Sequence, residues 1–151
     1  MYTIQREPLA DVKGGIDKMS PEHWDEVETI PFVLDVDWDL LFSLEKLGSL
    51  LCIGARKDGE CVGYAVYIIS PMSHCIGRVS AHCDSIFLHP DHRCGALGIR
   101  LVREGDRILA EEGADLIVQN VRNSSVKLAG VLDRLDYEMQ GYVYTKTLGE
   151  D

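Results

Sequence analysis

The sequence has no long apolar run, no leader-like start and no excess of basic residues. No apolar stretch approaches the ~20 residues needed to span a bilayer, and the first residues lack the basic start and apolar core of a secretory signal. We therefore expect a cytoplasmic protein without a membrane partner. The formal net charge of −10 opposes binding to phosphate backbones, so nucleic acid is not an expected partner.

Cysteine is present, but not in the patterns that build a disulfide framework or a zinc site. The five cysteines include no Cys-x-x-Cys pair, and their odd number favours reduced thiols. Several histidines and cysteines fall within residues 74–92, but they lack the usual spacings of zinc ligands. Strand alternation would also send His82 and Cys83 to opposite faces. No metal is expected.

Two phosphate-binding motifs are missing as well. There is no G-x-x-x-x-G-K-[ST] loop, and no G-x-G-x-x-G fingerprint opens an N-terminal Rossmann unit. Internal repeats and linker-like stretches are also lacking. With 151 residues, of which 46% are hydrophobic and 26% charged, the chain has the size and composition of a soluble globular protein with one domain over residues 1–151.

The apolar patterns predict a mixed α/β (α+β) protein. β-forming residues and alternation predict strands at residues 2–6, 50–56, 61–70, 79–88, 116–121 and 142–148. Helical spacing predicts helices at residues 21–28, 37–47, 96–113 and 128–135. The order is helices, antiparallel strands, then strand–helix–strand–helix–strand. Its central βαβ unit places a helix N-terminus beside a strand end.

Local signals mark several element ends. Ser20 has the chemistry of an N-cap, with Pro21 at the first helical position. Residues 57–60 have the composition of a hairpin turn, and residues 71–77 form a polar loop. Gly113 suits the end of a helix.

The most informative segment is residues 86–99, where a strand ends, the chain turns at Pro90 and small residues open a helix. Backbone amides of small residues can approach an anion closely, and a helix N-terminus offers unpaired N–H donors and a favourable dipole. Arg93 adds a fixed positive charge. Together these features would hold a pyrophosphate. The alternative is a glycine-assisted turn without a ligand.

The pattern L-x-P-x-x-R-x-G-A-x-G over residues 88–98 resembles the acyl-CoA loop of the GNAT superfamily of N-acetyltransferases, usually written V-x-P-x-x-R-x-x-G-x-G. Ala96 stands where the first glycine usually lies. The order of elements from residue 52 to residue 148 resembles the same fold, a mainly antiparallel sheet flanked by helices. Residues 23–27 and 35–38 resemble a subgroup common in phage and bacterial genomes.

This resemblance implies acetyl-CoA or coenzyme A as the co-substrate. Phe87 and Leu88 would pair their backbone groups with the pantetheine arm, and Ser125 matches a helix asparagine that often contacts the cofactor. The pyrophosphate would be bound by Arg93 and by the amides of Cys94, Gly95, Ala96, Gly98 and Ile99.

Acyl transfer to an amine needs a base near the amine and a proton for the departing thiolate. Strand alternation would place His82, Asp84, Ile86 and Leu88 on one face. If that face meets the cleft, Asp84 is the first candidate base and His82 the second. The alternatives are a carboxylate that satisfies loop amides for Asp84, and a packed or surface imidazole for His82.

Many family members place a tyrosine as general acid on the last helix, where this chain has Leu132. Tyr142 or Tyr144 could replace it, or water could protonate the thiolate. His23 is a candidate on the substrate side, because its helix commonly shapes the acceptor pocket in this fold. A surface helix residue is the alternative for His23.

The resemblance thus implies an acetyl-CoA-dependent N-acyltransferase in which a primary amine attacks the thioester directly in a ternary complex. Two alternatives stay open: a catalytically inactive acyl-CoA-binding or sensing module, and an acidic protein-interaction module on the same fold. The acceptor could be a small-molecule or a protein amine. The strand expected at residues 142–148 could also pair across a homodimer.

Overall fold

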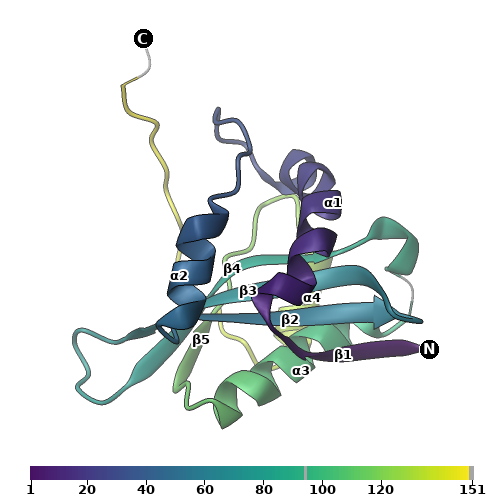
Figure 1. The fold of residues 1–151 in the computed structure, drawn as a ribbon. Helices are drawn as coiled ribbons and strands as arrows, with labels where there is room; N and C mark the ends of the chain where they lie inside the picture. The colour runs from purple at the N-terminus through teal and green to yellow at the C-terminus, as the bar shows by residue number, and fades with distance from the viewer. Residues whose placement is uncertain (94, 150–151) are drawn as a thin grey trace.

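The computed structural model describes residues 1–93 and 95–149. They form a five-stranded sheet in the order β1-β2-β3-β4-β5 with helices on both faces (Figure 1). The strands are β1 Tyr2–Glu7, β2 Leu50–Lys57, β3 Glu60–Pro71, β4 Val79–Leu88 and β5 Leu116–Val118. The helices are α1 Leu9–Val27, α2 Trp38–Lys46, the short 3₁₀ helix η1 Pro90–His92, α3 Leu97–Glu111 and α4 Val126–Arg134.

The sheet is mainly antiparallel, as predicted. Every neighbouring pair from β1 to β4 is antiparallel, and only β4 and β5 run parallel. The parallel pair results from α3, which carries the chain from the end of β4 back to the start of β5. The predicted βαβ unit is therefore confirmed, and the end of β4 lies next to the start of α3.

Two hydrophobic clusters hold the layers together. One face of the sheet packs against the apolar side of α1, including Leu9, Val12 and Ile16, with α2 beside it. The opposite face packs against α3 through Leu97, Leu101 and further apolar residues. The sheet is thus covered on both sides, with the N-terminal helices on one face and α3 on the other.

The first helix begins earlier than its capping signal predicted. Residues 9–19 already present Leu9, Val12, Ile16 and Met19 to the core, each at most 6% exposed. Burial of this stripe outweighs the local Ser20-Pro21 signal, so Pro21 lies inside α1 rather than at its start. The prediction that a helix starts at residue 21 was wrong.

The next two boundaries follow local chemistry. Asp37 caps α2 by accepting a hydrogen bond from the Leu40 amide at 2.9 Å, as an N-cap aspartate should. Asp58 and Gly59 both have positive φ, of 50° and 90°, between β2 and β3. Two such residues are what a two-residue hairpin turn of the favoured hand requires, so the predicted hairpin is confirmed.

The predicted last strand is not formed. Residues 138–149 carry no helix or strand, and β5 ends at Val118 rather than at residue 121. The sequence of residues 142–148 favours a strand, but a strand is stable only beside a neighbour. In this structure β5 is the last strand of the sheet, and the segment is not paired with it.

Candidate functional site

The strands β4 and β5 separate halfway along β4. They pair at only three positions, Ser80 with Leu116, Ala81 with Ile117 and His82 with Val118. Beyond His82, β4 continues to Leu88 with β3 as its only strand neighbour among the described residues. The backbone N–H and C=O groups on that side of β4 are therefore available to an extended ligand.

A β-bulge at Asp84 changes which side chains share a face. Val66 of β3 lies opposite Ser85 and Tyr67 lies opposite Cys83, so Asp84 has no single partner. One inserted residue reverses the alternation. Cys83 and Ile86 therefore contact the same hydrophobic cluster, which places His82, next to Cys83, on the other face from Ile86. The prediction that His82, Asp84, Ile86 and Leu88 share one face was wrong.

Asp84 is exposed where the two strands part. The protein around its carboxyl group restricts solvation, and this raises the pKa of Asp84 above its ordinary value. A carboxylate with a raised pKa accepts a proton more readily than a free aspartate does. An aspartate with a raised pKa therefore lies where β4 and β5 part.

The loop after β4 leads into an uncapped helix. Val62 of β3 holds its start by accepting from the His89 amide at 2.8 Å, and His89 Nδ1 accepts from the Asp91 amide at 3.2 Å. Gly95 has a φ of +65°, a conformation that favours glycine. Helix α3 then begins with Ala96 as N-cap, without a capping side chain.

The amides at this helix start are the predicted pyrophosphate donors. Within the described part of the chain, those of Gly95, Ala96, Gly98 and Ile99 donate to no other described residue. Among the described residues, the first backbone bond at the start of the helix is from Arg100 N to Ala96 O, at 2.9 Å. Cys94, also predicted to contribute, lies outside the described residues. These amides form the donor-rich helix start that favours an anion.

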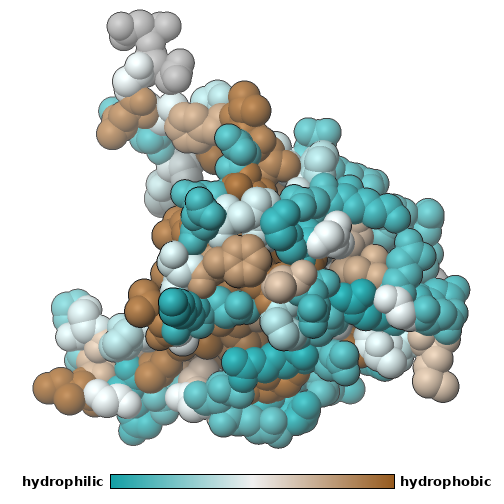
Figure 2. Space-filling model, in the orientation of Figure 1, coloured by the Kyte–Doolittle hydropathy of each residue, from teal (hydrophilic) through white to brown (hydrophobic). Residues whose placement is uncertain are grey.

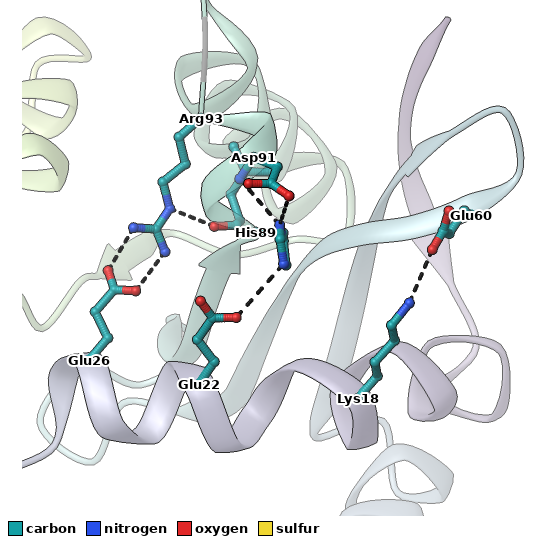
Figure 3. Close-up of polar contacts among 8 residues, drawn as sticks. Lys18, Glu22, Glu26, Glu60, His89, Asp91 and Arg93 are labelled. Carbon is teal, nitrogen blue, oxygen red and sulfur yellow. Dashed lines mark hydrogen bonds and ion pairs between the residues drawn. The ribbon is translucent and has the colours of Figure 1, made fainter.

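Arg93 is engaged by the protein itself. Its Nε donates to the Leu88 carbonyl at 2.6 Å, and its two terminal nitrogens donate to the two carboxylate oxygens of Glu26 at 2.7 and 2.8 Å (Figure 3). The guanidinium also lies 5.1 Å from the centre of the Phe87 ring. Arg93 therefore ties the end of β4 and its loop to α1.

Helix α1 provides two acidic side chains to this loop: Glu26, which pairs with Arg93, and Glu22. Glu26 and Glu22 lie one turn apart on α1, and Glu22 Oε2 is 3.8 Å from His89 Nε2 (Figure 3). The hydrogen bonds from Arg93 hold the pKa of Glu26 below its usual value. Sequence reasoning missed Glu26, because a separation of 67 positions from Arg93 hides the pairing.

His23, predicted on the substrate side, is packed against β4. Its Nδ1 is 2.9 Å from the Tyr64 hydroxyl, and its ring stacks on Phe87 with centroids 4.7 Å apart. Burial lowers the pKa of His23, so its imidazole is neutral at neutral pH. The structure thus brings His23 next to Phe87, one of the predicted pantetheine contacts.

A second ion pair joins the end of α1 to the segment after β5. Arg122 Nη2 donates to Glu28 Oε2 at 2.8 Å, and Glu28 Oε1 accepts from the Thr29 amide at 3.0 Å. The Glu28 side chain is only 8% exposed. Nothing in the sequence indicated this contact, which spans 94 positions.

Polar groups also meet behind the fork, on the α3 side. The Tyr137 hydroxyl donates to Asp106 Oδ1 at 2.5 Å, and Gln119 Nε2 donates to the Tyr67 hydroxyl at 3.4 Å. Gln119 Oε1 is buried without a hydrogen-bond partner among the described residues. Burial raises the pKa of Asp106 above its ordinary value.

The remaining predicted residues lie on α4 and on the C-terminal segment. Leu132, at the position of the family tyrosine, is buried, and Ser125 is the N-cap of α4 without a side-chain cap. Tyr142 and Tyr144 are 80% and 90% exposed on the unpaired C-terminal segment. The structure therefore does not bring the phenol of Tyr144 to the fork, because the strand that was expected to carry it is not formed.

Two hollows in the surface lie away from this fork. One is lined by Ile4, Arg100, Arg103 and Glu104, and the other lies between the start of α1 and β2. The candidate site is the open edge of β4 and the start of α3, because the unpaired backbone groups lie there. The described residues contain no cluster of three or more potential metal ligands and no helix long and apolar enough to cross a membrane.

The fold is similar to that of solved acetyltransferases. A ribosomal-protein-alanine N-acetyltransferase from Brucella melitensis biovar Abortus 2308 has 18% identity and a TM-score of 0.74, over 99% of this chain and 100% of that one. An aminoglycoside acetyltransferase from an uncultured soil metagenomic sample has 13% identity and a TM-score of 0.78, over 98% and 97%.

A third structure contains the expected donor. It is a predicted acetyltransferase from Clostridium acetobutylicum solved with acetyl-CoA, with 10% identity and a TM-score of 0.71, over 98% of this chain and 97% of that one. A search of curated protein sequences found no match. The model of the acetyltransferase (GNAT) family matches residues 16–137. The chain therefore belongs to the GNAT acetyltransferase family.

Proposed function

We propose that residues 1–151 act as one domain that transfers an acetyl group from acetyl-CoA to a primary amine. The amine attacks the thioester directly while donor and acceptor are both bound. The observation that carries this proposal is the unpaired edge of β4, which leads directly to the uncapped start of α3. The extended pantetheine arm of the donor would pair with the edge of β4, and its anionic diphosphate would bind at the start of α3.

The residues present fit the donor. The backbone of Phe87 and Leu88 would pair with the pantetheine arm, and the amides of Gly95, Ala96, Gly98 and Ile99 would bind the diphosphate. A Cβ added at Gly95 or Gly98 would meet no atom within 4 Å, so the space beside these residues is open for a ligand. Cys94 and Ser125 stay predicted contacts.

Asp84 is the proposed base. It lies at the fork, in the bulge where β4 leaves β5, and its raised pKa suits the removal of a proton from an ammonium group. His82, two residues earlier on β4, stays the second candidate. His23 is neutral and stacked on Phe87, so we propose that it shapes the acceptor side or relays a proton there.

For Arg93 we propose a role that differs from the direct pyrophosphate contact expected from the sequence. A direct pyrophosphate contact would require its guanidinium to leave Glu26 and the Leu88 carbonyl. We propose instead that Arg93 is a positioning residue, which holds the loop so that the amides at the start of α3 face the donor. If Arg93 positions the loop, neutralising Glu26 should weaken acetyl-CoA binding. If Arg93 contacts the diphosphate directly, neutralising Glu26 should strengthen it.

The acceptor is an amine of unidentified structure. The similar proteins include one named for ribosomal-protein alanine and one named for aminoglycosides, so both protein and small-molecule amines stay candidates. The net charge of −10 favours a cationic acceptor over an anionic one. A cytoplasmic location and a kinship with phage proteins stay predictions from the sequence.

A donor-binding module without catalysis is the second candidate. It is favoured by the buried Leu132 at the tyrosine position and by the exposure of Tyr144 on the unpaired C-terminal segment. Such a module would bind acetyl-CoA without releasing thiol to any amine. Water at the exposed fork would be the proton source if the chain is an active enzyme.

Calorimetry with acetyl-CoA tests the donor site. We expect Gly98→Leu to weaken binding at least about tenfold, since its side chain would obstruct the helix start. Gly14→Leu is the matched control, because Gly14 is a helical glycine with open space around it on α1. No binding by the unchanged protein, or equal losses in both variants, would contradict the proposal. Thiol release over a panel of amines then separates the enzyme from the binding module.

A further inference from the structure

The apolar stripe of α1 continues into a histidine whose side chain reaches the sheet. The buried residues of this helix are Leu9, Val12, Ile16 and Met19. His23 comes one turn after Met19, which places it on the same face of α1. Figure 2 shows mainly hydrophilic side chains over the outward side of the helix. The His23 imidazole is therefore turned toward the sheet, where it contacts Tyr64 and Phe87.

The hydroxyl of Tyr64 has His23 as its one polar partner among the described residues. It lies 2.9 Å from His23 Nδ1, and Tyr64 is only 1% exposed. If Nδ1 carried a proton and donated it to the hydroxyl, the hydroxyl hydrogen would be buried without an acceptor. Such an unsatisfied donor is costly inside a protein. The hydrogen bond therefore runs from the Tyr64 hydroxyl to His23 Nδ1.

The proton of the neutral ring then lies on the other nitrogen of His23. Burial lowers the pKa of His23, and of the charged groups near it Glu26 raises this pKa while Arg93 lowers it. The ring is thus neutral at neutral pH, with one proton. Because Nδ1 accepts a hydrogen bond, that proton is on Nε2. Nε2 has no partner in the described part of the chain and is not among its buried unpaired atoms, so solvent or a ligand can reach it.

A histidine that acts as a general base is oriented in the opposite sense. In such a site a carboxylate accepts from the Nδ1–H group, and the lone pair of Nε2 takes the proton. No ion pair joins His23 to a carboxylate among the described residues, and both carboxylate oxygens of Glu26 bind Arg93. A tyrosine hydroxyl in place of the carboxylate donates to Nδ1 and so leaves an N–H group at Nε2. The polarity of His23 is therefore that of a hydrogen-bond donor.

We propose that Tyr64 is a positioning residue, which fixes neutral His23 in its Nε2–H form so that His23 donates a hydrogen bond to the acceptor and takes no proton from it. This inference rests on the proposed transfer to an amine, with α1 on the acceptor side. It assigns a chemical feature to the acceptor, namely a hydroxyl or carbonyl oxygen close to the reacting amine. His23 then shapes the acceptor side without relaying a proton, and Asp84 stays the proposed base.

NMR of the two ring nitrogens of His23 tests the assignment without donor or acceptor. We expect the Nε2–H form in the unchanged protein at neutral pH. In Tyr64→Phe, which removes only the hydroxyl, the ratio of the Nδ1–H to the Nε2–H form should rise at least about fivefold. Tyr67→Phe is the matched control, because Tyr67 is a buried tyrosine of β3 on the opposite face of the sheet, and it should leave these signals unchanged. An Nδ1–H form or a charged ring in the unchanged protein, or no change in Tyr64→Phe, would overturn the proposal.

Two substitutions at His23 test its role toward the acceptor, with an amine that the unchanged protein acetylates. His23→Gln keeps an N–H donor but cannot take a proton, whereas His23→Leu has no polar group. We expect the KM for the amine to stay close to its original value in His23→Gln and to rise about fivefold or more in His23→Leu. Equal rises in both variants, or an equal fall in kcat, would contradict the donor role. If no amine is acetylated, the proposed function fails, and the NMR experiment still decides the form of His23.

Discussion

The loop from β4 to α3 and the C-terminal segment, residues 138–149, differ in how they are held, because only the loop is bonded to other parts of its own chain. The loop is tied to α1 by Arg93 and Glu26, to the end of β4 by the Leu88 carbonyl, and to β3 by the His89 amide. Residues 138–149 have no such bonds to other described residues. A segment takes a defined place when its polar groups find partners inside the chain, and otherwise it remains available to another molecule.

The largest effect is expected on the free energy of unfolding, and it tests how firmly a partner within the chain holds a segment in place. Glu7, at the end of β1, is buried and accepts from Arg56 at 2.7 Å. Arg56→Met would leave this carboxylate buried without its partner, which should lower the free energy of unfolding by about 3–5 kcal/mol. Urea denaturation measures the loss.

The matched control for Arg56 is Lys18, whose partner Glu60 is on the surface. Lys18→Met should change the free energy of unfolding by no more than about 1 kcal/mol, because exposed ion pairs contribute little. Losses of the same size in both variants would show that burial of the partner does not decide how firmly a segment is held.

The second effect concerns the fork beside the loop. Asp84→Asn removes the proposed base but keeps the shape of the side chain, so we expect the rate of acetyl transfer at saturating substrate to fall about 100-fold or more. Donor affinity should stay the same, because Asp84 is not among the proposed donor contacts. If Asp84→Asn retains the full rate, the base is another residue. His82→Gln is then the next variant to assay.

The third effect decides between the two roles of Arg93. If Arg93 positions the loop, Glu26→Gln and Arg93→Gln should each weaken acetyl-CoA binding several-fold, and the double variant should be no worse than either single variant. If Arg93 instead binds the diphosphate, Glu26→Gln should strengthen binding, because it frees the guanidinium. Arg93→Lys keeps the positive charge but not the two-pronged contact. Compared with Arg93→Gln, it should restore acetyl-CoA binding more fully if Arg93 contacts the diphosphate than if Arg93 only positions the loop.

The contribution of the Arg93–Glu26 ion pair to the stability of the fold should depend on pH in a definite direction. Because Arg93 lowers the pKa of Glu26 in the folded chain, the pair stabilises the fold above the ordinary glutamate pKa of about 4.3. This contribution is lost as pH falls through the lower folded pKa. The pair is partly exposed, so it should be worth no more than about 1 kcal/mol. Thermal unfolding of Glu26→Gln and the unchanged protein should converge as the pH falls.

The smallest effect is expected in the C-terminal segment. Tyr144→Ala should change the free energy of unfolding of the dilute monomer by less than about 0.5 kcal/mol, since the side chain is 90% exposed. A large loss of stability in the dilute monomer would mean that the segment packs on the rest of its own chain. The segment would then be held as the loop from β4 to α3 is.

Local patterns predicted most of the fold. The hairpin at Asp58 and Gly59, the helix that begins near Asp37 and the passage from β4 into α3 follow from patterns within a few residues. The same holds for the small residues at the start of α3, whose amides form the core of the candidate site. The bounds that were predicted wrongly depend on residues far away in the sequence. Helix α1, for example, begins at Leu9 because one face of the sheet buries its apolar stripe.

The sequence by itself determined the family, the order of elements and the loop that would meet an anion, because these depend on neighbours along the chain. Tertiary structure alone decided that a bulge at Asp84 reverses the face of His82 and that Glu26 occupies Arg93. It also left residues 142–148 without a neighbouring strand. Each of these depends on which distant residues are brought together, and a short sequence pattern contains no information about such partners.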